Sequence, residues 1–411
     1  MKKILVVVDS INVNDSSGSK ANVALINNLV EGGFDILVYH YTRINIQLKN
    51  VDCISIPEKK ITLLYFLSRS QRVFTKLSKL NLAPFFEKIF GFSFTFFNDT
   101  YSIKEALLKC NFEPDLIITL SKGASFRPHY ALLGLPELHS KWMAYVHDPY
   151  PMHYYPRPYN FIEVSYKQKQ QFFLEVSQKA RYSAFPSLLL KDWMGSYFQN
   201  FNRTAVIIPH QNAPYEIKIF EFPTYFAISK FNILHAGNLM AQRSPKGLMD
   251  GFILFLQNNP DAQNNARLLL LGTSTDHSQM MEEYKRKYSE IYISEGNVSF
   301  DDVYQIQKRV SVNVILEAIS EISPFLPGKF PHCVAANRTI LSLAPYNSET
   351  RRLLGDDYPY WAEQNDSVKI ASIIEKLYHL WKQNPVNLLL NRKDLEDYLS
   401  AENLKKVIIN L

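Results

Sequence analysis

Residues 323–345 read SPFLPGKFPHCVAANRTILSLAP, and this stretch decides the fold class of the chain. Pro and Gly punctuate its first six residues, and Lys329 to Ala336 then predicts a short helix whose first-turn N–H groups are suited to an anion. Asn337 and Arg338 predict a turn, and the β-branched and apolar run Thr339 to Ala344 predicts a buried strand. Together these signals predict a phosphate-facing helix and strand at the carboxyl edge of a parallel sheet.

A second signal of the same kind begins at Phe231. The apolar run Phe231 to Ala236 predicts a strand, Gly237 follows it directly, and Leu248 to Leu256 predicts a helix. Arg243 and Lys246 lie between strand and helix. A glycine there lets a ligand approach the backbone, and fixed cations stabilise negative charge on a departing phosphate.

Both stretches resemble the donor-binding segments of retaining glycosyltransferases of family 4. One branch of that family carries S-P-F-x-P-S-K-x-x-[DE]-Y-x-x-A-x-[KR]-P-I-L, preceded by a G-x-L…R…K-G pattern. The residues that fit the first pattern are Ser323, Pro324, Phe325, Pro327, Lys329, Ala336, Arg338, Ile340 and Leu341. The family's two glutamates, eight positions apart, fall on Pro324 and His332, and neither residue is a carboxylate.

The resemblance implies an α/β chain with the GT-B fold, in which two Rossmann-like domains face each other across a cleft. Residues 1–210 are then the acceptor domain, residues 211–230 the linker and residues 231–385 the nucleotide-sugar domain. Residues 386–411 are expected to form a C-terminal helix that returns to the first domain. A length of 411 residues exceeds what one core usually supports, and a hydrophobic content of 46% suffices for two.

The first domain contributes three candidate site residues. Gly18 precedes the helical run Lys20 to Glu31, where the family carries a glycine loop near the reaction centre, although a glycine before a helix is also a common turn device. The predicted strand Lys141 to Val146 runs into His147 and Asp148. By the resemblance, either one orients the donor sugar or the acceptor hydroxyl; a histidine at a strand end can also be purely structural.

The resemblance implies further contacts to the donor. Arg243 and Lys246 would act on the diphosphate, together with His147 and Asp148 as the catalytic set. The expected donor-binding residues are Gly18, Gly237, Asn238, Gly272, Pro327, Gly328, Lys329, His332, Ser348 and Glu349. A short strand is expected at Asn297 to Phe300, where the family reads the base.

The implied activity is transfer of a sugar, of the hexosyltransferase type, from a nucleoside-diphosphate sugar to a glycan, lipid-linked or other cell-envelope acceptor in polysaccharide biosynthesis. Transfer retains the anomeric configuration, and the donor phosphate takes the acceptor proton. No metal and no cofactor are expected, since Arg243, Lys246, Lys329 and the helix start at Gly328 replace the cation. Two alternatives are a nucleotide-sugar epimerase of the same fold and a non-catalytic sugar-nucleotide binding protein, which the loss of both family glutamates favours.

The spacing of the cysteines and the length of the apolar runs indicate the cellular location to expect for the protein. The three cysteines, Cys53, Cys110 and Cys333, are scattered, which argues against a disulfide framework or a zinc site. The amino-terminal apolar run is interrupted by Asp9, and the sequence has no apolar run of about 18 residues. A cytoplasmic location without a nucleic-acid partner is therefore expected, with peripheral attachment to the inner face of the cell membrane as a further expectation.

The basic charge is concentrated in the first half of the chain. Residues 1–210 hold 24 Lys and Arg against 16 Asp and Glu, whereas the remainder holds 21 against 23. Within that half, Lys59 to Phe97 interleaves aromatic and basic side chains, a basic amphipathic pattern that fits either a helix packed on the sheet or docking to an anionic membrane surface. The Tyr- and Pro-rich loop Met152 to Tyr159 is expected to be an acceptor rim or a packed lid.

Overall fold

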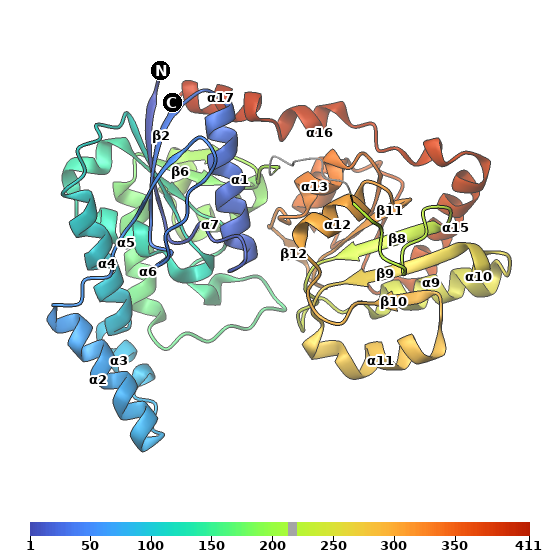
Figure 1. Cartoon of the computed structure of the whole chain (residues 1–411), viewed down its shortest axis with the longest axis horizontal. Coiled ribbons are helices and arrows are strands. Elements are labelled where there is room, and N and C mark those ends of the chain that lie inside the picture. Colours follow the sequence, from blue (N-terminus) through green and yellow to red (C-terminus); the bar gives the residue numbers. More distant parts are fainter. Residues whose placement is uncertain (213–219) are drawn as a thin grey trace. The chain divides into compact units, whose positions relative to one another are not determined.

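The computed structural model describes residues 1–212 and 220–411, which divide into two compact units (Figure 1). The first unit comprises residues 1–155, 160–212 and 399–411, and the second comprises Pro156–Tyr159 and residues 220–398. Part of the predicted linker, residues 213–219, lies outside the described residues.

The first unit is built on a seven-stranded parallel sheet with strand order β3-β2-β1-β4-β5-β6-β7. Its strands are β1 (Lys3–Val8), β2 (Asp35–His40), β3 (Asp52–Ser55), β4 (Leu116–Leu120), β5 (Trp142–Tyr145), β6 (Tyr182–Phe185) and β7 (Ala205–Ile207). Its α-helices are α1 (Ser17–Glu31), α2 (Leu63–Ser78), α3 (Ala83–Phe90), α4 (Phe94–Leu107), α5 (Arg127–Leu133), α6 (Tyr166–Lys179), α7 (Leu188–Tyr197), α8 (Phe201–Thr204) and α17 (Ala401–Ile409). The central strands are buried on both faces, as their continuous aliphatic runs require.

The second unit has a six-stranded parallel sheet with order β10-β9-β8-β11-β13-β15 and a separate pair of short strands, β12 and β14. Its strands are β8 (Phe231–Ala236), β9 (Ala266–Leu271), β10 (Ile291–Ile293), β11 (Val312–Leu316), β12 (Ile322–Ser323), β13 (Thr339–Leu343), β14 (Asn347–Ser348) and β15 (Trp361–Ala362). Its α-helices are α9 (Lys246–Asn258), α10 (Ala262–Asn265), α11 (Ser278–Lys287), α12 (Phe300–Gln307), α13 (Phe330–Ala335), α14 (Glu349–Leu354), α15 (Ser367–Gln383) and α16 (Lys393–Tyr398). Both sheets are therefore doubly wound Rossmann-like sheets, as predicted.

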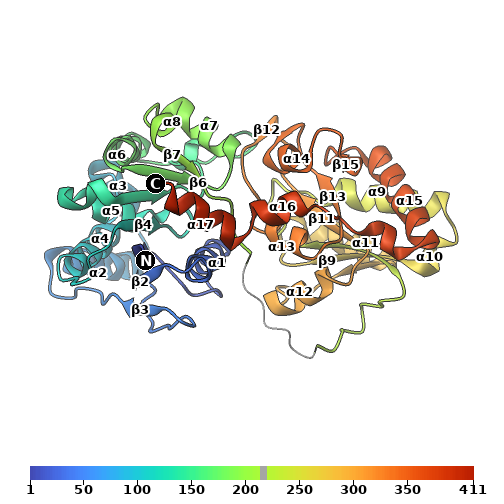
Figure 2. The same ribbon diagram turned by 90° about the horizontal axis from the view of Figure 1, so that it is seen from above.

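The last helix, α17, packs on the first unit beside α1 (Figure 2). Leu404 and Ile408 are buried in the core that also contains Ile26 and Leu29 of α1. The Lys2 ammonium donates to the carbonyl of Ile408 at 2.9 Å. The C-terminal segment thus completes a core that begins with the first strand.

Residues 220–230, the described end of the predicted linker, pack on the second unit. Phe226 is buried in a cluster with Leu234 and Leu269. Tyr225 stacks on Tyr292 of β10, with ring centroids 4.0 Å apart and planes 10° from parallel. These rings cover the sheet face that would otherwise be exposed at β9 and β10.

The strand expected at Asn297 to Phe300 is not formed; β10 lies earlier, at Ile291–Ile293. Gly296 turns the chain with a φ of 87°, and Ser299 then caps α12 by accepting a hydrogen bond from the Asp302 N–H at 3.1 Å. The helix forms here instead of a strand because a serine with acidic residues in the next turn stabilises a helix start.

A buried charge network ties together the carboxyl ends of β1 and β2 and two helices of the first unit. The carboxylate of Asp99 on α4, fully buried, accepts hydrogen bonds from Tyr41 at 2.8 Å and Arg43 at 2.7 Å. Arg127 at the start of α5 lies 3.0 Å from Asp99 and 3.4 Å from Asp9.

Asp99→Asn should destabilise the protein by about 2 to 3 kcal/mol, because it leaves two arginines without their shared counter-charge. The loss falls short of that for a fully buried pair, since the Arg43 side chain is 40% exposed. Chemical denaturation measures the free energy of unfolding of the wild type and the variant. Asp397→Asn is the matched control: its partner Lys393 has a side chain 76% exposed, and the unfolding midpoint should not change. Equal effects of the two substitutions would contradict the role of Asp99 as the shared counter-charge of the two arginines.

Candidate functional site

In a doubly wound sheet, ligands bind where the strand order reverses, beyond the carboxyl ends of the two central strands. In the second unit this point lies between β8 and β11, which are neighbours with Val312 paired to Ile233. Gly237 directly follows β8 and Glu317 directly follows β11. The candidate donor site is built around these two residues.

Two glycines bring the backbones beyond β8 and β9 into direct contact. The Gly237 N–H donates to the Leu271 carbonyl at 2.8 Å, and both Gly237 and Gly272 have a φ of 139°. A Cβ atom on Gly272 would lie 2.5 Å from the Gly237 carbonyl oxygen. The amide oxygen of Asn238 accepts from the Thr273 N–H at 3.3 Å. The predicted residues Gly237, Asn238 and Gly272 are therefore neighbours in space.

A group of basic side chains faces this backbone. The Lys329 ammonium lies 3.5 Å from each ring nitrogen of His235, and a Cβ atom on Gly237 would lie 3.1 Å from it. Burial, reinforced by the Arg243 charge, lowers the pKa of Lys329 to about 7. Burial and the charges of Lys329 and Arg243 hold the pKa of His235 well below its usual range. An anion placed here would relieve this mutual repulsion.

Glu317 is a member of this group that was not predicted from the sequence. Its side chain is 4% exposed, and neither carboxylate oxygen has a hydrogen-bond partner. Burial raises its pKa to about 7, with opposing effects from the Ser323 and Thr350 hydroxyls and from Arg243. The sequence did carry a signal, because a carboxylate that directly follows a buried parallel strand lies at the ligand-binding edge.

Other predicted donor contacts already have partners. Lys246 begins α9, is exposed, and pairs with Asp250 at 2.5 Å. Ser348 caps α14 by accepting from the Arg351 N–H at 3.2 Å. Both carboxylate oxygens of Glu349 accept from Arg352, at 3.0 and 2.7 Å.

The loop that carries Pro327, Gly328 and Lys329 leads into α13, which is six residues long. The Pro327 carbonyl accepts from the Phe330 N–H at 2.8 Å. The ring of His332 packs edge-on against Phe300 of α12, at a centroid distance of 4.9 Å. Because so short a helix has a small dipole, the positive charge at this position comes mainly from Lys329.

In the first unit, Gly18 lies in the first turn of α1 and not in a loop before it. The helix begins earlier than expected because Ser16 caps it, accepting from the Ser19 N–H at 3.1 Å. A Cβ atom on Gly18 would lie 3.4 Å from the Gly123 nitrogen. Gly18 thus lies where the loops after β1 and β4 meet, at the point where the strand order of this sheet reverses.

His147 and Asp148 follow β5. The His147 ring is buried, stacks on His210 at a centroid distance of 5.9 Å, and has no hydrogen-bond partner on either nitrogen. Burial holds the pKa of His147 well below its usual range, with the neighbouring His210 acting in the same direction. The imidazole is therefore neutral at physiological pH and has one donor and one acceptor nitrogen for a ligand.

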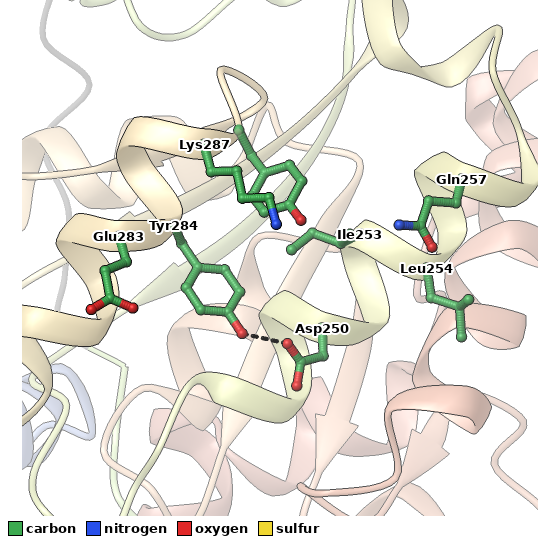
Figure 3. A pocket seen from close by; sticks show the side chains of 8 residues that line it. Asp250, Ile253, Leu254, Gln257, Glu283, Tyr284 and Lys287 are labelled. Atoms are coloured by element: carbon green, nitrogen blue, oxygen red, sulfur yellow. Dashed lines mark hydrogen bonds between the residues drawn. The ribbon is translucent and has the colours of Figure 1, made fainter.

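A pocket of about 280 Å³ lies elsewhere on the second unit, between α9 and α11 (Figure 3). Tyr284 and Asp250 meet at its wall through a hydrogen bond of 2.5 Å. Its lining comes from these two helices and from Tyr288, which follows α11, and none of the predicted site residues borders it. It is therefore separate from the candidate donor site.

Comparison with known proteins defines the fold. No family model and no curated protein matches the sequence. Among solved structures, the N-terminal domain of Candida albicans trehalose-6-phosphate phosphatase has a TM-score of 0.62 at 13% identity, with 100% of this chain and 96% of that chain covered. A UDP-forming trehalose-phosphate synthase of Burkholderia xenovorans in complex with glucose-6-phosphate has a TM-score of 0.62 at 10% identity, covering 100% and 99%. Anabaena HepE in complex with UDP and glucose has a TM-score of 0.53 at 10% identity, covering 100% and 97%.

These likenesses extend over both units. The chain has the GT-B fold of glycosyltransferases, as its sequence predicted.

Gly272→Ala should destabilise the protein by about 3 kcal/mol, because the new Cβ collides with backbone and also requires an unfavourable φ. Gly296→Ala is the matched control: Gly296 has a φ of 87° but no heavy atom within 4 Å of its would-be Cβ. The control should lose about 1 kcal/mol, from φ alone. Urea denaturation compares the two variants, and equal losses would show that the contact between the two loops does not constrain the backbone.

Proposed function

We propose that the chain is a retaining glycosyltransferase of family 4 that transfers a sugar from a nucleoside-diphosphate sugar. The observation that carries this proposal is the second unit's site, where two backbones are in contact beside the buried His235 and the half-buried Arg243 and Lys329, at the point of strand-order reversal. Glycines admit a diphosphate and the cations neutralise it. The complexes of structural neighbours with UDP and glucose and with UDP-2-fluoroglucose support the donor class.

In this proposal the positive charges of Arg243, Lys246 and Lys329 stabilise the nucleoside diphosphate as the glycosidic bond breaks, without a metal ion. Such preorganised charge acts most strongly in a site from which water is excluded. The leaving phosphate takes the proton of the acceptor hydroxyl, so no separate base is needed. His147 or Asp148 orients the donor sugar or the acceptor.

A panel of nucleotide sugars with detection of released nucleotide tests the activity. A glycosyltransferase releases nucleotide in the presence of a suitable acceptor, and even slow hydrolysis of the donor gives a signal. An epimerase alters the sugar without release, and a binding protein does neither. UDP-glucose and UDP-galactose are the first donors to test, because UDP occurs in the neighbouring complexes. A glycan or lipid-linked cell-envelope acceptor is the proposed second substrate.

Arg243→Ala and Lys246→Ala should each lower nucleotide affinity and transfer rate, by about ten- to a thousandfold, because each removes a charge from the leaving group. Lys285→Ala, on the exposed surface of α11, is the control and should change neither quantity. Calorimetric titration with UDP and initial-rate measurements give the comparison. Wild-type turnover in both site variants would exclude the diphosphate role.

The first unit also has a surface suited to an anionic membrane. In Figure 1, α2 and α3 extend beyond α4, away from the sheet of their unit. The only buried residue of α2 is Ser68, and α3 has none. The apolar side chains of Phe66, Phe85 and Leu77 are 58%, 59% and 81% exposed. Among the described residues, no helix is both long and apolar enough to cross a bilayer.

We therefore propose that this α2–α3 hairpin docks on anionic lipid, which would place the enzyme at the inner face of the cell membrane. The segment Lys59 to Phe97 contains seven Lys and Arg residues and one acidic residue, Glu87. Exposed phenylalanine and leucine enter the acyl boundary, and the lysines stay at the headgroups. Each lysine near the surface contributes about 1 kcal/mol, and salt screens this contribution.

The protein should sediment with phosphatidylglycerol vesicles at low salt, and binding should fall as salt is raised. Lys76→Glu combined with Lys79→Glu should abolish it, since both side chains are exposed and their reversal repels the headgroups. Lys285→Glu combined with Arg286→Glu, an equal charge change on α11, should bind like the wild type. Equal recovery with neutral and anionic vesicles would contradict the proposal.

A further inference from the structure

The carboxylate of Glu317 has no assigned role, although it lies in the centre of the candidate donor site. Its backbone is fixed at the end of β11, where its N–H donates to the Leu343 carbonyl at 2.9 Å. The β8–β11 register pairs Asn313 with Leu234, and its continuation brings Glu317 level with Asn238. Glu317 therefore lies opposite the Gly237 loop, across the point where the strand order reverses.

This carboxylate is buried in a state that a folded protein normally avoids. Neither oxygen has a hydrogen-bond partner, and the side chain is 4% exposed. Ser323 and Thr350 lie near enough to lower its pKa, but without hydrogen-bond geometry. A buried polar group without partners is destabilising, so it calls for an explanation beyond packing.

The surroundings of Glu317 differ from those of the nearby buried carboxylate Glu349. Glu349 accepts from Arg352 with both oxygens and is thus committed to an ion pair. Glu317 interacts with Arg243 and Lys329 through charge only, without a hydrogen bond to either. These cations can bind an anionic ligand without breaking a hydrogen bond to Glu317, and the carboxylate oxygens remain available to hydrogen-bond donors of the same ligand.

A sugar linked to a diphosphate presents this combination of groups. Its phosphates carry negative charge for Arg243 and Lys329, and its ring carries adjacent hydroxyl groups. A carboxylate accepts hydrogen bonds from two neighbouring hydroxyls at once, which a neutral amide oxygen does less strongly. We propose that Glu317 is the residue that binds the hydroxyl groups of the donor sugar and so contributes to the choice of sugar. This inference rests on the proposed nucleotide-sugar activity and adds a specific residue to it.

The test separates binding of the sugar from binding of the nucleotide. Wild type, E317Q, E317D and the control E321Q, whose side chain is on the surface, are titrated calorimetrically with UDP, GDP and dTDP. The same proteins are titrated with UDP-glucose, UDP-galactose, GDP-mannose and dTDP-glucose. Measurements are made at pH 7 and at pH 8, because Glu317 and Lys329 both have a pKa of about 7 and a higher pH ionises the carboxyl while it neutralises the ammonium.

E317Q should bind the nucleotide sugar about ten- to a hundredfold more weakly than the wild type and bind the free nucleotide within about threefold of it. E317D keeps the charge and should recover part of the loss, and E321Q should match the wild type. A deoxy-sugar nucleotide that lacks the contacted hydroxyl should bind wild type and E317Q equally, since the two changes remove the same interaction.

Equal weakening of nucleotide and nucleotide sugar by E317Q would show that Glu317 only positions the cations, and would overturn the inference. An E317Q protein that binds both ligands like the wild type would also overturn it, while leaving the proposed activity intact. A wild-type protein that binds none of the nucleotides and none of their sugars would overturn both proposals. Melting curves of each variant identify a protein that is not folded, and E317D then carries the comparison.

Discussion

The structure depends on the reversal of strand order next to the first strand of each parallel sheet. Parallel strands place all their carboxyl ends at one edge, and the reversal makes the loops after β8 and β11 turn to opposite faces. The backbones there are not covered by a crossing helix, so polar groups can gather without filling a core. In the second unit, the backbones at Gly237 and Gly272, which follow β8 and β9, contact each other in this space.

The same region also gathers ionisable side chains. His235, Glu317 and Lys329 are each displaced from their ordinary pKa by burial. This arrangement lowers the stability of the ligand-free protein, because neither the cations nor the carboxylate are fully paired. In the proposed complex, a ligand with a phosphate and hydroxyl groups would supply both missing partners.

In the first unit, the buried carboxylate of Asp99 is paired. Asp99 is paired with Arg43, Arg127 and Tyr41, and the resulting network joins α4 and α5 to the ends of β1 and β2. His147 is the contrasting group there, buried and without hydrogen bonds on either ring nitrogen. Paired charges hold the scaffold, whereas His147 and Glu317, which lack hydrogen bonds, both follow the ends of strands, where ligands bind in this fold class.

The sequence alone determined the two Rossmann-like sheets, because continuous aliphatic runs followed by glycine and polar residues admit few other arrangements. The resemblance read from the sequence grouped Gly237, Gly272 and Lys329, and the structure places Gly237 against both of the others. The prediction from the sequence misplaced the short strand near Gly296, because a four-residue stretch with two apolar side chains does not outweigh a serine cap. Only the tertiary structure decided which polar side chains are buried without partners. Glu317 and Glu349 look alike in the sequence, and the pairing of one with Arg352 is a contact that local pattern does not encode.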